Sequence, residues 1–445
     1  MLSKEDNELL TRVGPGTPMG DLMRQYWVPA LLSEELPAPG CPPVRIRLLG
    51  ESLVAFRTGT GEVGLLEHAC PHRGASLFFG RNEADGLRCV YHGWKFDVAG
   101  RCIDMPSEPP ESTFKHRVRA TAYPCRERNG VVWAYLGPRA TPPPLPDLEP
   151  NMLPAGTWTV AAVLRECNWL QALEGDIDTA HLGFLHLGAI PVDAATPGTF
   201  SEYTLRDRAP RYQVAVTDYG TMYGAYRPAG ADTYYWRIAH FLLPFYTMPP
   251  VGVLGHKIVV RAWVPMDDEH TMFIMMGPRP TTGSGTSNGS TTTFEGATLG
   301  RPPLLPNTTD WYGRWRPVAN STNDYLIDRE KQRTRSYTGI DGIHMQDQAI
   351  TESMGPIVDR SKERLSSSDT MIIKTRQVLL QAVKALRTTG ATPLSVDDPS
   401  VYRVRAGGVV LPRDADWIEA TRELRAAFVE HPGLDLSITG NVPGA

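Results

Sequence analysis

The chain has 445 residues, of which 41% are hydrophobic and 21% are charged, and its formal net charge at pH 7 is −4. The length allows two or three ordinary domains, and the composition is that of a globular protein with a sizeable core. The small negative charge and the lack of a long basic run give no reason to expect nucleic-acid binding. The N-terminus is polar and charged, and the most apolar stretch, residues 240–255, contains three prolines. We therefore expect no secretory signal, no membrane span and a cytoplasmic location.

The first predicted elements are a helical segment and a β-rich region. Residues 8–30 have a helical pattern that is interrupted at Gly14-Pro15-Gly16. Residues 44–48 then alternate apolar and basic side chains, as a half-buried strand does, and further short strands separated by turn sequences continue to residue 136. About a hundred residues of short strands and frequent turns indicate a small antiparallel β domain.

A proline-rich segment follows at residues 138–156, which contain seven prolines. Because proline stiffens the chain and cannot continue a strand ladder, this segment predicts a domain boundary. Beyond it we expect a helix over residues 168–182, a surface loop rich in Thr, Ser and Gly over residues 281–296, and a mainly helical last third. Strands are expected at residues 212–216, 221–226, 233–239, 257–264 and 271–276. The downstream domain is therefore α+β.

Two of the expected β-domain loops carry paired cysteines and histidines. Cys70 and His72 form a Cys-x-His motif, and sixteen residues later Cys89 and His92 form Cys-x-x-His. Two thiolates and two imidazoles on two short loops are the ligands of a mixed-ligand iron–sulfur cluster. A zinc site and chance clustering are the alternatives, but the ligand order differs from the zinc-finger pattern. We expect the other four cysteines to be structural thiols, because the chain is long and poor in cysteine for a disulfide scaffold. They are Cys41, Cys102, Cys125 and Cys167.

A second candidate metal site lies in the helical segment after the proline-rich boundary. Asp178, His181 and His186 have the spacing Asp-x-x-His-x4-His. A catalytic ferrous iron needs neutral imidazoles and one carboxylate, with open positions for O2. Residues five apart lie about 140° apart on an ideal helix, so both histidines reach one ion only if the helix ends or distorts between them, which Gly183 allows. Two unrelated helix histidines are the alternative interpretation.

At these residues the chain resembles the oxygenase (alpha) subunits of the Rieske non-haem iron aromatic-ring-hydroxylating oxygenases. The match runs through Cys-Pro-His-Arg-Gly at residues 70–74 and Cys-Val-Tyr-His-Gly-Trp-Lys-Phe at residues 89–96. It covers nearly the whole chain and is closest to the phthalate-dioxygenase-like branch. The resemblance implies a [2Fe-2S] Rieske cluster held by Cys70, His72, Cys89 and His92.

The resemblance also implies a mononuclear Fe(II) held by His181, His186 and an aspartate far downstream. Asp347 is the best match for that aspartate, while Asp341 and Asp359 are rival candidates, and we expect the nearby His344 to pack or hydrogen-bond rather than bind the metal. Asp178 is implied to bridge His181 to a cluster histidine, expected to be His92, of the neighbouring subunit. Electrons would pass between the two centres at that bridge.

The implied fold is α+β. We expect a Rieske antiparallel β domain at residues 40–155 and a catalytic domain at residues 156–445. The catalytic domain would have a helix-grip (START-like) fold, in which a curved antiparallel sheet wraps over a helix. Residues 1–39 form a helical segment expected to pack on the catalytic domain. The implied assembly is a homotrimer or a dimer of trimers, supplied with electrons by a flavin and iron–sulfur reductase.

The implied function is O2-dependent cis-dihydroxylation of an aromatic acid such as a phthalate-like compound. The alternative is O-demethylation or monooxygenation of a methoxylated aromatic acid, which uses the same iron ligands. More distant alternatives are a Rieske electron carrier without catalysis and a ligand-binding module with a vestigial iron site. Four residues, in the segment expected to line the cavity, are substrate-binding candidates: Arg206, Arg208, Arg237 and His240. An arginine there could clamp a carboxylate through two hydrogen bonds, although each of the three is also typical of a surface or structural role.

Overall fold

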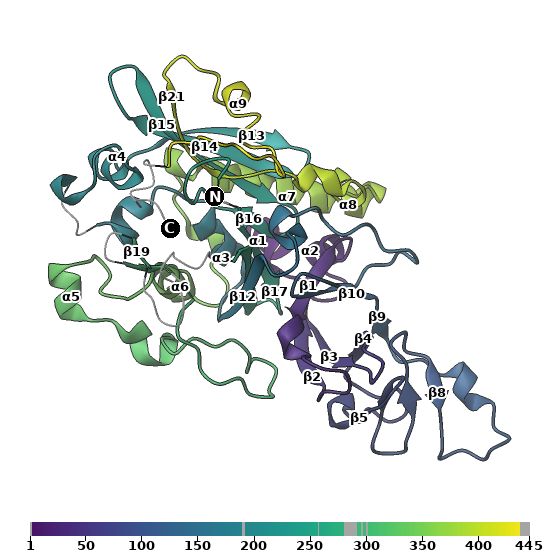
Figure 1. Cartoon of the computed structure of the whole chain (residues 1–445). Helices are drawn as coiled ribbons and strands as arrows, with labels where there is room; N and C mark the ends of the chain where they lie inside the picture. Colours follow the sequence, from purple (N-terminus) through teal and green to yellow (C-terminus); the bar gives the residue numbers. More distant parts are fainter. Residues whose placement is uncertain are drawn as a thin grey trace.

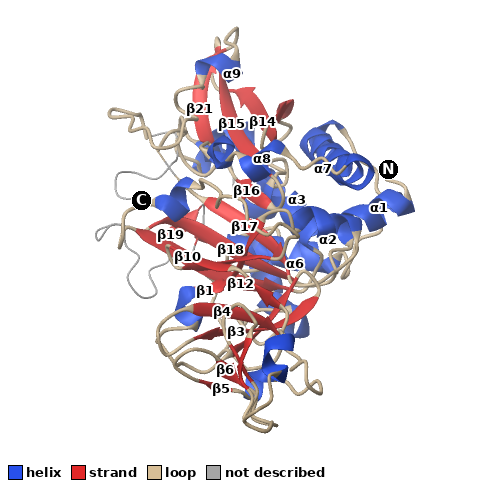
Figure 2. Ribbon diagram, turned by 90° about the vertical axis from the view of Figure 1, so that its right-hand side faces the viewer, coloured by secondary structure: helices blue, strands red, loops and turns tan. Residues whose placement is uncertain are grey.

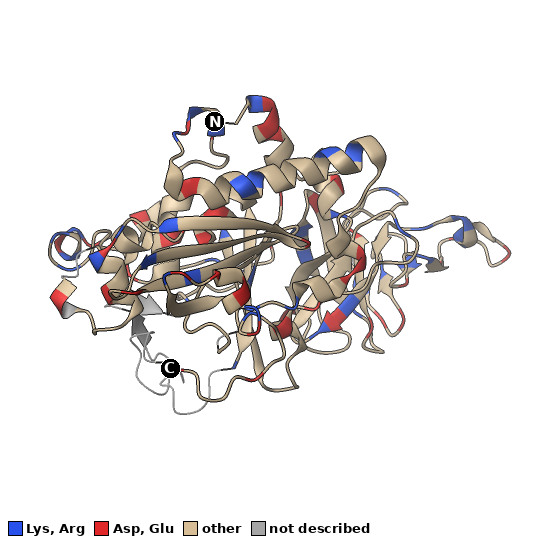
Figure 3. Cartoon of the chain, turned by 90° about the horizontal axis from the view of Figure 1, so that it is seen from above, with Lys and Arg blue, Asp and Glu red and all other residues tan. Residues whose placement is uncertain are grey.

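The computed structural model describes residues 2–188, 192–256, 258–279, 292–294, 297–299 and 301–436. Figure 1 shows a small lobe, built by the purple and blue part of the chain, that projects from a larger lobe. In the part described, no helix is long and apolar enough to cross a membrane. Basic and acidic residues are interspersed along the ribbon, in line with the small net charge (Figure 3).

The small lobe is made of short antiparallel strands. One four-stranded sheet has the order β2-β3-β4-β9 and the other β5-β6-β7-β8. The strands of the first sheet are β2 (Val44–Leu48), β3 (Glu51–Arg57), β4 (Val63–Glu67) and β9 (Ala122–Tyr123). Those of the second are β5 (Arg81–Asn82), β6 (Leu87–Arg88), β7 (Lys95–Phe96) and β8 (Cys102–Asp104). A separate core of twelve buried side chains, which includes Cys70, Cys89 and Trp94, holds this lobe together.

A third sheet joins the small lobe to the large one. It has the order β1-β11-β10, with β1 (Trp27–Leu32), β10 (Cys125–Arg128) and β11 (Val131–Tyr135). Because β1 is a strand, the helical pattern expected over residues 8–30 holds only for α1 (Lys4–Thr11) and α2 (Pro18–Met23). The glycines and proline at residues 14–16 lie in the segment that separates the two helices, and the apolar run after residue 26 pairs with β11 instead of continuing a helix.

The large lobe is built around an eight-stranded antiparallel sheet of order β12-β18-β17-β16-β15-β14-β13, with β21 also paired to β15. Its strands are β12 (Trp158–Arg165), β13 (Arg211–Thr217), β14 (Gly220–Pro228), β15 (Thr233–Leu242), β16 (Tyr246–Met248), β17 (Val260–Pro265), β18 (Thr271–Pro278) and β21 (Gly407–Pro412). The expected strand over residues 257–264 is thus β17, and Lys257 lies outside the described residues. So do residues 281–291, 295 and 296 of the expected loop, although β19 (Thr292–Phe294) pairs with β20 (Ala297–Leu299).

The long helix α7 (Thr370–Thr389) lies across this sheet and packs on β13 and β14, where Thr375 and Thr221 share a buried hydrogen bond of 2.9 Å. The N-terminal helices lie beside it, and Figure 2 shows α1, α2, α3 (Trp169–Asp176) and α7 gathered on one side of the sheet. The side chains of Trp169 and Asn168 donate to backbone oxygens of α1. The remaining helices are α4 (Phe200–Arg206), α5 (Arg329–Thr334), α6 (Ile343–Ser353), α8 (Leu394–Asp397) and α9 (Trp417–Ala420). A sheet covered by one long helix is the expected helix-grip arrangement.

Candidate metal centres

The Cys70 and Cys89 loops have the same backbone design. In the first, Gly74 N–H donates to Cys70 O at 2.8 Å, and in the second Gly93 N–H donates to Cys89 O at 3.0 Å. Both glycines have φ near +75°, at 75° and 79°, a left-handed conformation that side chains other than glycine rarely adopt. The two loops are therefore a matched pair of tight turns, each presenting a cysteine at its start.

The side chains of these two loops approach one another within the small lobe. Both thiols are buried, and burial raises the pKa of the Cys70 thiol to about 11, with a further contribution from Cys89. The rings of His72 and His92 have centroids 4.3 Å apart, and His72 stacks on Trp94 at 4.2 Å. The buried Nδ1 of His72 has no hydrogen-bond partner among the described residues. An unpartnered imidazole nitrogen together with two buried thiols fits a cluster with two thiolate and two imidazole ligands.

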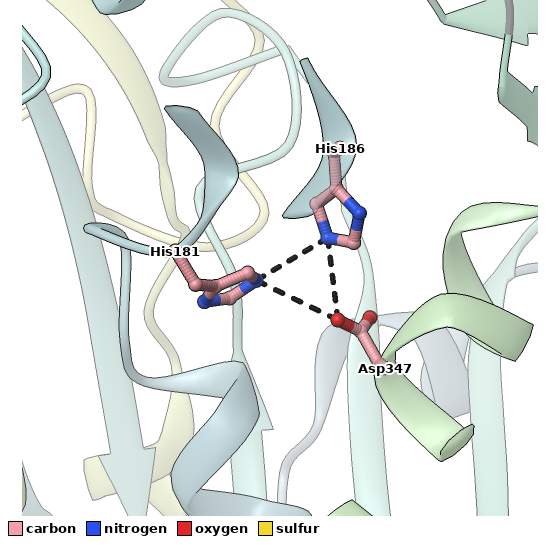
Figure 4. Close-up of side chains that lie close together, drawn as sticks. All are labelled: His181, His186 and Asp347. Carbon is pink, nitrogen blue, oxygen red and sulfur yellow. Dashed lines mark hydrogen bonds and ion pairs between the residues drawn. The ribbon is translucent and has the colours of Figure 1, made fainter. Parts of the chain in front are cut away.

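The second centre is a triangle of ligand-type atoms in the large lobe (Figure 4). His181 Nε2 and His186 Nε2 are 3.2 Å apart, and Asp347 Oδ1 lies 3.6 Å from the first and 3.2 Å from the second. All three atoms lie within 4.8 Å of one another. Two imidazoles and one carboxylate around a common point fit a mononuclear non-haem iron with open positions.

A distorted helix brings the two histidines together. The helix expected over residues 168–182 ends early, because α3 stops at Asp176, and residues 182–186 form a single π-helical turn. In that turn Leu187 N–H donates to Leu182 O, a bond between residues five apart. The wider turn brings residues five apart to the same side, so the required distortion between His181 and His186 is present.

The side chains of this triangle shift one another's pKa. Burial alone would raise the pKa of Asp347, but His186 and His181 hold it well below its usual range. Burial alone would lower the pKa of His181, yet the neighbouring Asp178 and Asp347 raise it. The carboxylate is therefore ionised, and the site attracts cations.

A second side chain contacts the Nδ1 atom of each histidine, on the side of the ring away from the triangle. Asp178 Oδ2 lies 3.3 Å from His181 Nδ1, and Gln346 Oε1 lies 2.7 Å from His186 Nδ1. Gln346 was not a candidate from the sequence, because only the position of α6 next to the π-helical turn brings it to His186.

The other expected candidates for this metal lie elsewhere. Asp341 is exposed and pairs with Lys331, and Asp359 accepts from Ser361 and pairs with Lys362. His344 is half-buried beside Phe273, with ring centroids 5.6 Å apart, and loss of solvation together with the nearby Arg261 lowers its pKa to about 3. Among the three downstream aspartates considered, only Asp347 joins the two histidines.

A pair of buried arginines lies on the sheet face beside Thr179. Arg237 on β15 is 7% exposed, donates through Nε to Thr179 Oγ1 at 2.8 Å, and lies 4.2 Å above the Phe200 ring. Arg227 on β14 is fully buried, and its two Nη atoms have no hydrogen-bond partner among the described residues. The register opposes Ala225 to Arg237 and Arg227 to Tyr235, so the two arginines are diagonal neighbours on one face. Burial and the nearby Arg237 lower the pKa of Arg227 to about 10.

Two of the expected substrate residues lie away from this pair, which corrects the expectation that all four line one cavity. The Arg206 side chain is 66% exposed and pairs with Glu202 at 2.6 Å. His240 lies on the opposite face of β15 from Arg237, because side chains three residues apart on a strand point in opposite directions. There it is fully buried, contacts the Tyr219 hydroxyl at 2.8 Å and donates to Arg405 O at 3.0 Å. Arg208 packs on Phe184 in the π-helical turn, with its guanidinium 5.0 Å above the ring.

Two family models match the chain. Residues 26–123 match the Rieske [2Fe-2S] domain, and residues 134–436 match the model described as LigXa C-terminal domain like. The chain is 49% identical, over 94% of its length and 97% of the relative, to the 3-chlorobenzoate-3,4-dioxygenase oxygenase subunit of Comamonas testosteroni. The chain belongs to the Rieske non-haem iron oxygenases. The resemblance inferred from the cysteine–histidine motifs is therefore confirmed.

Further relatives of this oxygenase agree. It is 38% identical to the phthalate 4,5-dioxygenase oxygenase subunit of Pseudomonas putida, over 96% of both chains. It is 31% identical to the 5,5'-dehydrodivanillate O-demethylase oxygenase subunit of a Sphingobium strain, over 91% of this chain and 85% of that one. The crystal structure of dicamba monooxygenase bound to dicamba shares the fold, with a TM-score of 0.54 at 18% identity over 82% of this chain and 99% of that one.

These relationships confirm the α+β fold and the cofactors. The oxygenase carries a Rieske [2Fe-2S] cluster and a mononuclear iron, and both candidate sites have side chains that fit them. The hypotheses of an electron carrier without catalysis and of a vestigial binding module are wrong, because the full-length relatives are oxygenase subunits.

Proposed function

We propose that this chain is the oxygenase component of a multicomponent system that uses O2 to cis-dihydroxylate an aromatic acid, such as a benzoate or a phthalate-like compound. The observation that carries the substrate class is the pair of buried guanidiniums, Arg227 and Arg237. Neither forms an ion pair with an acidic side chain in the part of the chain that is described. Two of the relatives are named for aromatic carboxylates, chlorobenzoate and phthalate.

The physical argument is that two neighbouring buried cations need an anion. A charge without a partner in the protein interior is strongly destabilising, and like charges side by side add repulsion. A carboxylate accepts two parallel hydrogen bonds from a guanidinium, which compensates the charge and fixes the orientation of the bound acid. Arg237 uses its Nε on Thr179, so its Nη groups remain to meet such a ligand. Thr179 lies two residues from His181, and a clamped acid would therefore lie near the metal triangle.

In this proposal Cys70, His72, Cys89 and His92 hold the cluster, and His181, His186 and Asp347 hold the iron. When bound, the two centres supply single electrons and the reductive activation of O2. The chain itself positions the substrate through its arginines and excludes water, since the arginine face is buried. The protein thus determines which bond is presented for oxidation.

Asp178 is proposed to link the two centres across a subunit boundary. Its Oδ2 lies 3.3 Å from His181 Nδ1, and its Oδ1, which accepts from Ala180 N–H at 2.6 Å, keeps a second lone pair for a cluster histidine, expected to be His92, of a neighbouring subunit. That arrangement requires a closed ring, and we propose a homotrimer or a dimer of trimers. A flavin and iron–sulfur reductase is the proposed electron donor.

The domain division and the location belong to the same proposal. Residues 1–39 would form an N-terminal segment, residues 40–155 the Rieske domain and residues 156–445 the catalytic domain. None of the six cysteines, all of which lie in the described part of the chain, forms a disulfide, which fits a reducing compartment and the cytoplasm.

O-demethylation of a methoxylated aromatic acid is the second candidate reaction. It is favoured by the 31% identity to a dehydrodivanillate O-demethylase subunit, and the same arginine pair would recognise the carboxylate of such a substrate.

A substrate panel tests the proposal. The purified oxygenase, supplied with a reductase, is given benzoates, phthalates and methoxybenzoates together with the amide of each, and substrate-dependent O2 uptake is measured. We expect uptake with acids and little with amides. A cis-diol product indicates dihydroxylation, whereas formaldehyde and a phenol indicate demethylation. Equal turnover of acids and amides would refute the recognition of a carboxylate.

A further inference from the structure

Helix α6 contacts both nitrogens of one imidazole through consecutive residues. Asp347 Oδ1 lies 3.2 Å from His186 Nε2, on the side where the metal triangle closes. Gln346 Oε1 lies 2.7 Å from His186 Nδ1, on the opposite side of the ring. Figure 4 shows that this second nitrogen of His186 points away from the triangle. Gln346 is 1% exposed and His186 is 6% exposed, so water does not compete for this bond.

The orientation of the Gln346 amide is fixed by its other end. Its Nε2 donates to the backbone oxygen of Ile340 at 3.0 Å. A carbonyl oxygen only accepts, so the amide nitrogen must face Ile340 and the amide oxygen must face His186. That oxygen also only accepts, so His186 must carry its proton on Nδ1. The chain of donors and acceptors therefore leaves the lone pair of His186 on Nε2, which is the nitrogen in the triangle.

We propose that Gln346 is a positioning residue for the catalytic iron. It holds His186 in the tautomer and ring orientation that present Nε2 to the metal. The inference rests on the proposed role of His186 as a metal ligand. It assigns a function to Gln346, which would act through His186 and would itself contact neither the substrate nor the metal. Acceptors behind metal-binding histidines commonly fix the ring and strengthen the ligand.

The two histidines of the site are held by acceptors of different charge. His181 has the carboxylate of Asp178 behind it, whereas His186 has a neutral amide. A second carboxylate behind His186 would add another buried negative charge beside Asp347, at a further desolvation cost. A glutamine gives the orientation without that charge. The negative charge behind the imidazoles is thus confined to His181, whose carboxylate is the proposed electron bridge.

Helix α6 offers a matched control for an experiment. Gln348 is also 1% exposed and donates to Leu164 O at 3.0 Å and to Glu352 Oε1 at 2.7 Å. It contacts neither histidine of the triangle. Gln346→Met and Gln348→Met each remove a buried amide from the same helix with little change in volume, but only Gln346→Met removes the acceptor for His186.

The test measures metal binding rather than turnover. The full chain keeps its cluster, the mononuclear site is emptied with a chelator, and the dissociation constant of Co(II) is measured by equilibrium dialysis. We expect Gln346→Met to raise that constant about 10- to 100-fold and to alter the Co(II) electron paramagnetic resonance signal. Gln348→Met should leave both unchanged, and the visible spectrum of the cluster reports in each variant that the chain is folded.

Two more variants separate the possible failures. Gln346→Glu in its protonated form keeps both contacts, because its O–H can donate to Ile340 O while its other oxygen accepts from His186 Nδ1, so it should restore most of the affinity that Gln346→Met loses. The positioning role would be overturned if the Co(II) dissociation constant were unchanged in Gln346→Met or rose equally in Gln348→Met. It would also be overturned if Gln346→Glu recovered no affinity. His186→Ala must weaken Co(II) binding if His186 is a ligand. Unchanged binding in His186→Ala would refute the proposed iron site itself, whereas weak binding there with normal binding in Gln346→Met would refute only the role of Gln346.

Discussion

Replacing Arg237 by glutamine tests the recognition of a carboxylate most directly. The variant removes one of two neighbouring buried guanidiniums but keeps a side chain that can hydrogen-bond to Thr179. A hydrogen bond to a charged group contributes about 1.5–3 kcal/mol. At about 1.4 kcal/mol for each factor of ten, kcat/KM for the preferred aromatic acid should fall about 10- to 140-fold. Activity on the neutral amide of that acid should not fall.

The stability of the ligand-free protein should change in the opposite direction. Arg227 and Arg237 are diagonal neighbours whose strand positions lie roughly 7 Å apart, and we take the same spacing for their guanidinium charges. At an effective dielectric constant of about 20, the repulsion between them is about 2 kcal/mol. Arg237→Gln relieves this repulsion, so without substrate the variant should unfold at the same temperature as the parent protein or higher. Addition of the acid should raise the unfolding temperature of the parent protein more than that of the variant.

The measurements are reductase-coupled O2 uptake and thermal unfolding, each with and without the acid. Arg206→Gln is the matched control, because Arg206 is an exposed arginine paired with Glu202 on α4. Its kinetic constants and ligand-induced stabilisation should equal those of the parent protein. Equal losses with the acid and its amide, or an unfolding temperature that rises with the acid as much in Arg237→Gln as in the parent protein, would refute the argument.

Three further predictions concern the metal centres and pH. Asp347→Ala should lose about one iron per chain with the cluster spectrum intact, whereas Asp341→Ala, which alters a surface ion pair, should keep full iron content. Asp178→Asn should bind both kinds of iron but should slow the reoxidation of the cluster in a single turnover, because the amide has only one acceptor oxygen. The rate is measured by stopped flow, and a normal rate would leave Asp178 as an orienting residue for His181. Burial lowers the pKa of His240 to about 3 in the folded chain, below its value of about 6.5 when unfolded, so its contribution to stability is complete above about pH 6.5 and is lost as the pH falls. At pH 5 the free energy of unfolding should be lower by about 2 kcal/mol on account of His240. The urea midpoint of His240→Asn should therefore fall less between pH 7.5 and pH 5 than that of the parent protein, and equal decreases would contradict this expectation.

Features encoded within a few neighbouring residues could be predicted from the sequence. The cysteine–histidine motifs depend on two tight turns, and the glycines at positions 74 and 93 mark those turns directly. The distortion between His181 and His186 was also predictable, because an ordinary helix would separate the two imidazoles. Gln346 was not, since no local pattern relates it to a histidine 160 positions earlier. Only the docking of α6 against the π-helical turn brings that amide to the ring.

The arginine face shows how one strand boundary decides which side chains share a site. A strand predicted to end at residue 239 left His240 free to be placed with Arg237, whereas β15 runs on to Leu242. Within a continuous strand, residues 237 and 240 necessarily point to opposite faces. His240 therefore donates to the backbone oxygen of Arg405, while Arg237 donates to the Thr179 hydroxyl on the other face. The same alternation, carried across the hairpin to β14, places Arg227 beside Arg237. The register of one hairpin thus separates His240 from Arg237 and brings Arg227 into the proposed carboxylate site, a neighbour that the pattern along a single strand could not reveal.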